Sequence, residues 1–172
     1  GVGATSSSSA STTASMAQAR SLTANFSLKS YTLSLTAGSG GAVSGAGSFN
    51  HGTTPAIVAT PDTGYDFTGW SGAGVTSSSS ASTTASMTQT RSLTANFSLK
   101  SYTLSLQSGN GGIVVGAGTF DHGQQATIQA TPQTGYQFDT WKEAGVSLNA
   151  NPSTTILMNG DKNWTAIFTI QP

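Results

Sequence analysis

Residues 59–70 read ATPDTGYDFTGW, and residues 130–141 repeat the pattern as ATPQTGYQFDTW, 71 positions further along the chain. Each stretch combines the end of one predicted strand, a Pro-x-x-Gly turn and a second predicted strand with Tyr and Phe on one face. A tryptophan, Trp70 or Trp141, ends each copy. We therefore predict a core-building hairpin in each copy and no catalytic motif.

The same spacing recurs over the rest of the chain. Residues 5–35 and 76–106 align without a gap and are identical at all but two of 31 positions. The two differences are Ala17 against Thr88 and Ala19 against Thr90. This near identity indicates a recent tandem duplication of a unit of about 71 residues. We predict half a repeat at 1–29, a complete repeat at 30–100 and a complete, divergent repeat at 101–172.

The fold predicted for each complete unit is all-β, with six short strands and no helix. Residues 31–35 alternate apolar and hydroxyl side chains, which is typical of a half-buried strand. The glycine-rich residues 38–41 predict a tight hairpin, and glycines in the return strand suggest a bulge or an edge. The strands of the first complete unit are predicted at 31–35, 43–49, 56–59, 65–70, 84–87 and 93–97. Polar loops are predicted after each tryptophan, at 72–80 and 143–152.

A unit of this size buries only about 60% of its unfolded surface, so its large aromatic side chains are needed in the core. The predicted core aromatics are Phe49, Tyr65, Phe67, Trp70, Phe97, Phe120, Tyr136, Phe138, Trp141 and Phe168. Leu33, Leu35, Ile57, Met87 and Leu93 are predicted to pack with them. With only residues 98–101 between units, we expect a semi-rigid string of beads.

Composition excludes several classes of function. Only 7% of residues are charged and the net charge is zero, so no field attracts nucleic acid, and we expect neither nucleic-acid partners nor membrane insertion. The chain has no cysteine, which excludes disulfides, thiolate metal sites and cysteine nucleophiles. No apolar run approaches the roughly 18 residues of a membrane helix.

Five motifs occur in the same order in each unit: Gly-x-Gly-Gly, Phe-x-His-Gly, the Ala-Thr-Pro stretch quoted above, a methionine, and Leu-Thr-Ala-Asn-Phe. The chain therefore resembles the divergent internalin-B-type B-repeat of bacterial surface proteins. The last copy departs from the pattern where Trp164 replaces Leu93 and Ile167 replaces Asn96. The resemblance implies a β-grasp-like or β-sandwich-like module in a secreted or wall-attached protein, with spacer, stalk or adhesive roles and no catalytic residues.

The candidate chemical sites are weak. His51 and His122 are the only histidines, and each lies in a predicted surface turn with too few neighbouring ligands for a metal. We expect no cofactor and no enzyme activity, because no nucleophile with an orienting acid recurs. Asn25, Asn96 and Asn163 begin Asn-x-Ser/Thr triplets, which we interpret as outward strand positions rather than glycosylation sites. Lys29 and Lys100 suggest an isopeptide crosslink to a nearby Asn, but no Glu precedes Glu143 to assist it.

The function predicted is a non-enzymatic extracellular repeat, a stalk, spacer or filament-forming element in bacterial adhesion. Its partners are neighbouring repeats and other copies of itself in a filament. The alternative is a carbohydrate-binding adhesin module that meets a glycan or host surface through Tyr31, Tyr65 and Trp70. Two explanations of the half repeat stay open, an excerpt of a longer array, which we favour, or a half unit completed by another subunit.

Overall fold

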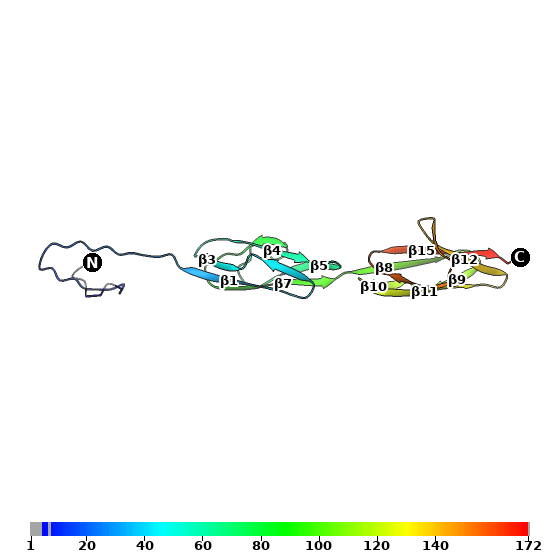
Figure 1. The fold of residues 1–172 in the computed structure, drawn as a ribbon, viewed down its shortest axis with the longest axis horizontal. Helices are drawn as coiled ribbons and strands as arrows, with labels where there is room; N and C mark the ends of the chain where they lie inside the picture. Colours follow the sequence, from blue (N-terminus) through cyan, green and yellow to red (C-terminus); the bar gives the residue numbers. More distant parts are fainter. Residues whose placement is uncertain (1–4, 7, 172) are drawn as a thin grey trace.

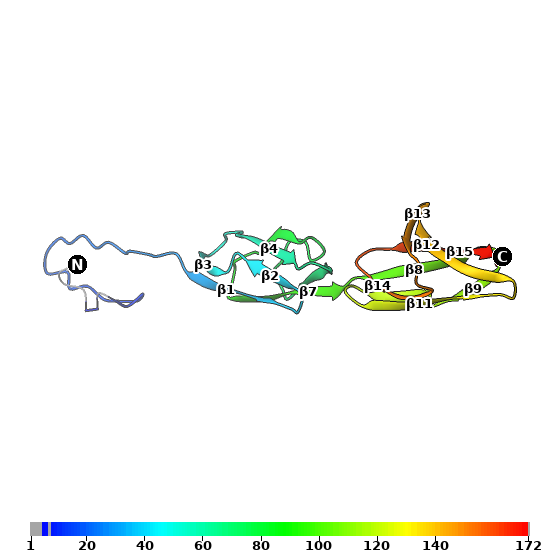
Figure 2. The same ribbon diagram turned by 45° about the vertical axis from the view of Figure 1, so that its right-hand side comes forward.

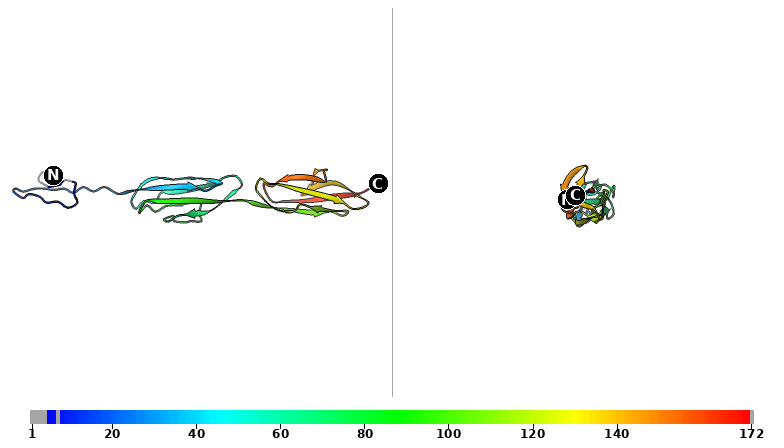
Figure 3. Two further views of the ribbon diagram at one scale, coloured as in Figure 1. Left: turned by 90° about the horizontal axis from the view of Figure 1, so that it is seen from below. Right: turned by 90° about the vertical axis from the view of Figure 1, so that its right-hand side faces the viewer.

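The computed structural model describes residues 5, 6 and 8–171. Figure 1 shows two repeats lying end to end along the long axis of the molecule, with the segment before residue 30 drawn as a chain without arrows. The end-on view in Figure 3 shows how narrow the molecule is across this axis. The described residues form fifteen strands and no helix, so the all-β prediction is confirmed.

The first repeat is built from two sheets. The larger sheet has the strand order β3-β1-β7-β5 and the smaller one β2-β4-β6. The strands are β1 (Ser30–Ala37), β2 (Gly41–Ser44), β3 (Gly47–Asn50), β4 (Ala56–Pro61), β5 (Tyr65–Ser71), β6 (Ser82–Thr84) and β7 (Arg91–Leu99). Buried and exposed residues alternate along the strands, as in β4, where Ile57 and Ala59 are buried between exposed neighbours.

The second repeat has the same plan with one additional strand. Its larger sheet has the order β10-β8-β15-β12-β13, and its smaller sheet the order β14-β11-β9. The strands are β8 (Ser101–Ser108), β9 (Gly112–Val115), β10 (Gly118–Asp121), β11 (Gln125–Pro132), β12 (Tyr136–Glu143), β13 (Val146–Asn149), β14 (Ser153–Leu157) and β15 (Lys162–Ile170). The unit is therefore a two-sheet sandwich repeated in tandem.

The first and last strands of each repeat are neighbours that run in the same direction. β1 pairs in parallel with β7, from Leu33 opposite Arg91 to Ala37 opposite Ala95. β8 and β15 pair in parallel in the second repeat. Because the two strands point the same way, the chain enters a repeat at one end and leaves it at the other, which sets the repeats in line (Figure 1).

The core of each repeat lies between its two sheets. In the first repeat it joins residues of the larger sheet with residues of the smaller sheet and of the segment after β6; its buried members are Leu33, Ile57, Ala59, Trp70, Ala85, Met87, Leu93 and Ala95. The equivalent cluster of the second repeat is Leu104, Ala126, Ile128, Ala130, Trp141, Ile156, Met158, Ala166 and Phe168.

Two turns predicted to close hairpins instead carry the chain from one sheet to the other. The Pro-x-x-Gly turn joins β4 of the smaller sheet to β5 of the larger one, and the turn at 38–41 joins β1 to β2 of the other sheet. The hairpin prediction is therefore wrong at both places. β5 pairs instead with β7, which lies between β5 and β1 and buries Leu93 and Ala95. β1 pairs with β7 on one side and on the other with β3, the end of the predicted return strand.

The predicted return strand 43–49 is split into β2 and β3, which belong to different sheets. Gly45, with φ of 107°, lies at the break, and a Cβ there would be 2.3 Å from the carbonyl oxygen of Ala56. Only glycine fits this approach, so the chain crosses between sheets at that residue.

Trp70 shares a core face with Phe67 because the β5 ladder is irregular between Phe67 and Gly69. An unbroken strand would turn Trp70 to the opposite face, since side chains alternate. The irregularity shifts the register, and the two rings meet with centroids 6.0 Å apart.

The predicted loop after Trp141 is in part a strand. β13 pairs antiparallel with β12, and the turn between them has Ala144 and Gly145 at φ of 49° and 84°. Two consecutive residues with positive φ favour a tight hairpin. This hairpin projects from the side of the second repeat, as Figure 2 shows at β13. In the first repeat the matching segment forms only a bridge between Val75 and Ala85.

The half repeat predicted before residue 30 has no strands in its described residues. Its apolar side chains are exposed instead: Phe26 is 94% exposed and Met16 72%. Residues 5–29 match residues 76–100 at all but two positions, but nothing equivalent to β1 or β5 lies beside the described residues of this segment.

Candidate functional site at the repeat junction

The described residues do not gather side chains for metal binding. No group of three or more His, Asp or Glu side chains able to hold a metal occurs among residues 5, 6 and 8–171. No helix of this part of the chain is long and apolar enough to cross a membrane. Residues of the recurring motifs instead meet at the junction between the two repeats.

Lys100 is the only residue between β7 and β8. Its backbone N–H donates to the carbonyl oxygen of Gly64 at 2.8 Å, and its carbonyl oxygen accepts from the N–H of His122 at 2.8 Å. Gly64 lies in the Pro-x-x-Gly turn of the first repeat and His122 in the Phe-x-His-Gly turn of the second. One residue thus binds a turn of each repeat, which leaves the linker little freedom.

The two turns also touch each other directly. A Cβ on Gly64 would lie 2.1 Å from the His122 ring, so the imidazole rests on bare backbone. Gly64 is buried, and its φ of 83° is readily adopted only by glycine. The His122 ring packs on Tyr102 with centroids 6.0 Å apart, and its buried Nδ1 has no hydrogen-bond partner among the described residues. His122 therefore acts here by ring packing.

The side chain of Lys100 adds a weak ion pair. Its Nζ lies 3.3 Å from Oδ1 of Asp66; the Lys100 side chain is partly exposed and that of Asp66 is exposed. Exposed pairs of this kind contribute about 0.2–1 kcal/mol. The backbone bonds and the histidine, not this charge pair, define the junction.

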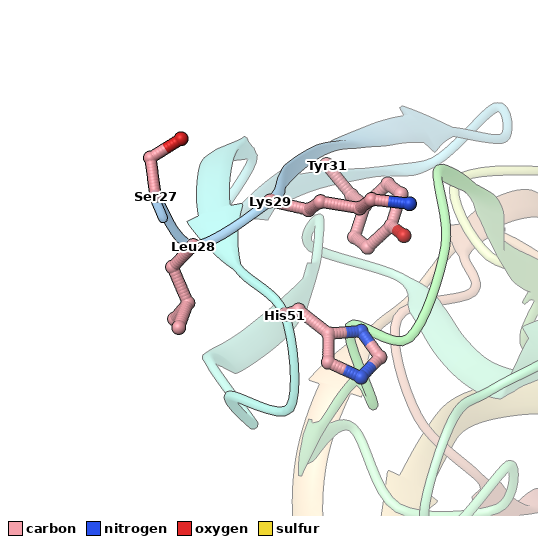
Figure 4. Close-up of a pocket in the computed structure, with 5 residues that line it drawn as sticks. All are labelled: Ser27, Leu28, Lys29, Tyr31 and His51. Atoms are coloured by element: carbon pink, nitrogen blue, oxygen red, sulfur yellow. The ribbon is translucent and has the colours of Figure 1, made fainter. Parts of the chain in front are cut away.

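The N-terminal end of the first repeat carries an open copy of the same arrangement. The His51 N–H donates to the carbonyl oxygen of Lys29 at 2.7 Å, and the His51 ring meets Tyr31 edge to face at 5.9 Å. Here a pocket of about 290 Å³ opens where a preceding repeat would sit; Ser27, Leu28, Lys29, Tyr31 and His51 line it (Figure 4). His51 is exposed, whereas His122 is half-buried.

The other half of the arrangement is present at the far end of the second repeat. The N–H of Gln171 donates to the carbonyl oxygen of Gly135 at 2.9 Å, as Lys100 does to Gly64. Gly135 has the same φ of 83°, but it is exposed and nothing lies within 4 Å of a Cβ built on it. The Pro-x-x-Gly turn at the end of one repeat therefore has the shape that accepts the histidine turn at the start of another.

The predicted core aromatics are either buried or half-buried. Trp70, Trp141 and Phe168 are buried, and the indole N–H groups of the first two donate to the carbonyl oxygens of Ser80 and Asn151 at 3.1 Å. Partly buried aromatics packed against the two clusters are Phe49, Phe67, Phe97, Phe120, Tyr136 and Phe138. Tyr65 is half-buried with its ring over Gly40.

The aromatic groups considered for glycan binding are not equally accessible. Trp70 is 5% exposed and its N–H is already bonded, so it offers no platform to a sugar. Tyr31 and Tyr65 are half-buried, the first beside His51 and the second against Gly40.

The groups considered for an isopeptide crosslink do not converge. The Asn96 side-chain amide donates to the carbonyl oxygen of Gly69 at 3.1 Å, while the Lys100 ammonium pairs with Asp66. Asn96 and Asn163 are exposed strand residues, and Asn25 is exposed in the segment before the first strand.

The turn around His122 is not the free surface predicted from the sequence, because the His122 ring covers Gly64 of the first repeat. The available signal was that Phe-x-His-Gly recurs in both units. The sequence of the linker does not indicate the junction, because Ser98 and Ser101 do not differ from other serines on the strands.

The fold and the junction define a class of protein, a tandem array of small β-sandwich repeats. A family model described as "Divergent InlB B-repeat domain" matches residues 31–101 and 102–172. The chain belongs to this family, which confirms the resemblance drawn from the five motifs, and repeats of the family occur in bacterial surface proteins. Searches of curated proteins and of solved structures gave no match to the chain.

Proposed function

We propose that the chain is a non-enzymatic structural element of a bacterial extracellular or cell-surface protein. Its repeats act as a stiff stalk or spacer that holds an adhesive part of the protein away from the cell, or that builds a filament. The single observation that carries this proposal is the junction, in which Lys100 binds both Gly64 and His122.

Stiffness follows from the length and bonding of this linker. A flexible spacer needs several unbound residues between domains, whereas here strands end and begin on either side of one residue. Each backbone hydrogen bond contributes about 0.5–1.5 kcal/mol net, and the His122 ring excludes water from Gly64. The favoured orientation of the two repeats is therefore narrow, and a longer array would multiply the length of a single repeat.

The proposal is tested by the distribution of distances between the repeats. Because the chain has no cysteine, Ser48→Cys and Thr119→Cys place one spin label on an exposed residue of each repeat without a background label. Pulsed electron paramagnetic resonance should give a narrow distribution of distances between the two spin labels. A matched variant with four Gly-Ser residues inserted after Lys100 should broaden it at least twofold.

A broad distribution in the parent chain, equal to that of the insertion variant, would refute the stalk proposal. The insertion variant should keep the denaturation midpoints of both repeats, because the insertion lies outside both cores. This control separates a loose junction from a damaged repeat.

A further inference from the structure

The second repeat contains two Asn-Gly pairs, and the first repeat has none. The pairs are Asn110 with Gly111 and Asn159 with Gly160. The side-chain amide of an asparagine before glycine can be lost without an enzyme, because the following backbone nitrogen reaches the side-chain carbonyl carbon and carries no bulky residue. This reaction requires the peptide group between the two residues to rotate, so the surroundings of each pair decide whether it proceeds in the folded protein.

Asn110 lies in a tight turn whose peptide groups are held in place. The carbonyl oxygen of Gly111 accepts from the N–H of Gln133 at 2.8 Å. Gly111 has φ of 96° and lies against the Tyr136 ring, since a Cβ there would be 2.1 Å from that ring. Rotation of the peptide group between Asn110 and Gly111 therefore requires the turn to break.

Asn159 lies in an open bend between β14 and β15. Its side chain is exposed, and neither this side chain nor the N–H of Gly160 forms a hydrogen bond with the described residues. Nothing lies within 4 Å of a Cβ built on Gly160. The peptide group between these two residues can therefore rotate without displacing a neighbour.

The open bend lies beside the histidine turn of the junction. Met158, which precedes the bend, is 0% exposed, and its carbonyl oxygen accepts from the N–H of Gly123 in that turn at 2.8 Å. Asp161, which follows the bend, accepts at Oδ1 from the N–H of Thr103 at 2.7 Å. The two residues of the bend thus connect two anchored positions at the end of the second repeat that meets the first.

We propose that Asn159 is a site of spontaneous deamidation in the folded protein. The backbone nitrogen of Gly160 gives its proton to a solvent base and attacks Cγ of Asn159. The bond between this nitrogen and Cγ forms, the bond between Cγ and Nδ2 breaks, and Nδ2 takes a proton from solvent and leaves as ammonia. The product of this step is a five-membered cyclic imide.

One water molecule then opens the imide in either of two ways. Cleavage between the nitrogen and Cγ gives aspartate, and cleavage between the nitrogen and the backbone carbonyl carbon gives isoaspartate, in which the chain continues through the side chain. The sum of both steps is an amide and water giving a carboxylic acid and ammonia, so no oxidant or cofactor is consumed.

The product changes the charge and the backbone next to the junction. A carboxyl group at residue 159 is ionised at neutral pH and lies two residues from the carboxylate of Asp161. Isoaspartate also lengthens the backbone by one methylene between the anchored residues Met158 and Asp161. The first repeat has Thr88 and Gln89 at these positions, so only the second repeat changes with time. This inference goes beyond the stalk proposal and does not depend on a stiff junction.

The test follows the mass of two tryptic fragments during incubation of the folded chain at mildly alkaline pH. Cleavage after Lys100, Lys142 and Lys162 places Asn110 in one fragment and Asn159 in the next. The fragment with Asn159 should gain one mass unit and separate into aspartate and isoaspartate forms, with the change located at residue 159 by fragmentation. It should react at least tenfold faster than the fragment with Asn110. Equal rates, or a faster reaction at Asn110, overturn the proposal.

A denatured sample separates the effect of the fold from that of the sequence. In concentrated denaturant both asparagines should react at similar rates, because the turn around Asn110 is lost. If Asn159 keeps a tenfold lead in denaturant, the local sequence rather than the open bend sets its rate, and the structural argument is overturned.

A variant tests the attacking nitrogen. Gly160→Ala should slow the reaction at Asn159 at least tenfold, and the added Cβ meets no neighbour, so the repeat should stay folded. An unchanged methyl NMR signal of the buried Met158 checks the fold of the variant. A Gly160→Ala chain that deamidates as fast as the parent overturns the proposal.

The aged protein shows where the new charge lies. The amide signal of Gly123 and the methyl signal of Met158 should each split into old and new positions in proportion to the modified fraction, while the Met87 methyl in the first repeat should not. Modified protein without this splitting would overturn the placement beside the histidine turn. The spin-label distance in freshly prepared protein tests the stalk proposal separately, so the two proposals can fail independently.

Discussion

Residues 5–29 and 76–100 are nearly the same sequence in two structures. In the second copy, residues 91–99 form β7, the central strand of a sheet, and bury Leu93. In the first copy no strand forms among the described residues and Leu22 is half exposed. Since the local sequence is shared, the difference comes from neighbouring strands, so strand formation here is decided by pairing rather than by propensity.

The same contrast holds at the ends of the repeats. His122 and Gly64 are covered by each other, while their counterparts His51 and Gly135 face solvent. In each matched pair, the same substitution can be made at a residue that is covered and at its counterpart, which faces solvent. The change without a neighbour serves as the control.

The largest difference is expected for the matched leucines. Leu93→Ala should lower the free energy of unfolding of the first repeat by about 2–5 kcal/mol, because a fully buried leucine leaves a cavity. Leu22→Ala should change it by less than about 0.5 kcal/mol. Denaturant unfolding followed by the methyl NMR signal of Met87, which is buried in the first repeat, measures both. Equal losses would mean that residues 5–29 already pack on the first repeat.

The matched glycines of the Pro-x-x-Gly turns should differ in kind. Gly64→Ala and Gly135→Ala each force a left-handed conformation on alanine, which costs about 1–2 kcal/mol in its own repeat. Only the Cβ at position 64 also meets the His122 ring. The spin-label distance distribution should therefore broaden in Gly64→Ala and stay narrow in Gly135→Ala. Equal broadening would show that the histidine contact does not hold the junction.

The smallest difference is expected for the matched lysines. Lys100→Ala removes an exposed ion pair with Asp66, which should lower stability by no more than about 0.5 kcal/mol at low salt and by nothing measurable at high salt. Lys29 has no ion pair among the described residues, so Lys29→Ala should be neutral at both. Unfolding curves at two salt concentrations test this. A loss above about 1 kcal/mol at high salt would point to packing of the lysine stem instead of its charge.

Much of the repeat could be predicted from the sequence because its signals are local. Strict alternation at 31–35 predicted β1, and the large aromatics of the Pro-x-x-Gly stretch indicated which side chains approach the core. The irregularity that turns Trp70 inward was not visible, since it depends on how β5 meets β7. The all-β prediction did not depend on this irregularity.

The predictions that failed concern partners distant in sequence. A tight turn between two strands suggests a hairpin, but the partner of β5 is β7, which lies more than twenty residues further on. The short strand predicted at 84–87 lies instead at Ser82–Thr84, because its partner β4 fixes the register. The junction was missed for the same reason, as Gly64 and His122 belong to different repeats.

The parallel pairing of β1 with β7 also decides how a repeat would respond to tension. A pull transmitted through Lys29 and Lys100 acts on the start of β1 and on the end of β7, in opposite directions along two adjacent strands. The ladder from Leu33–Arg91 to Ala37–Ala95 is then loaded in shear, so its hydrogen bonds must break together rather than one by one. The parallel pairing therefore makes each repeat resistant to extension along the axis of the array.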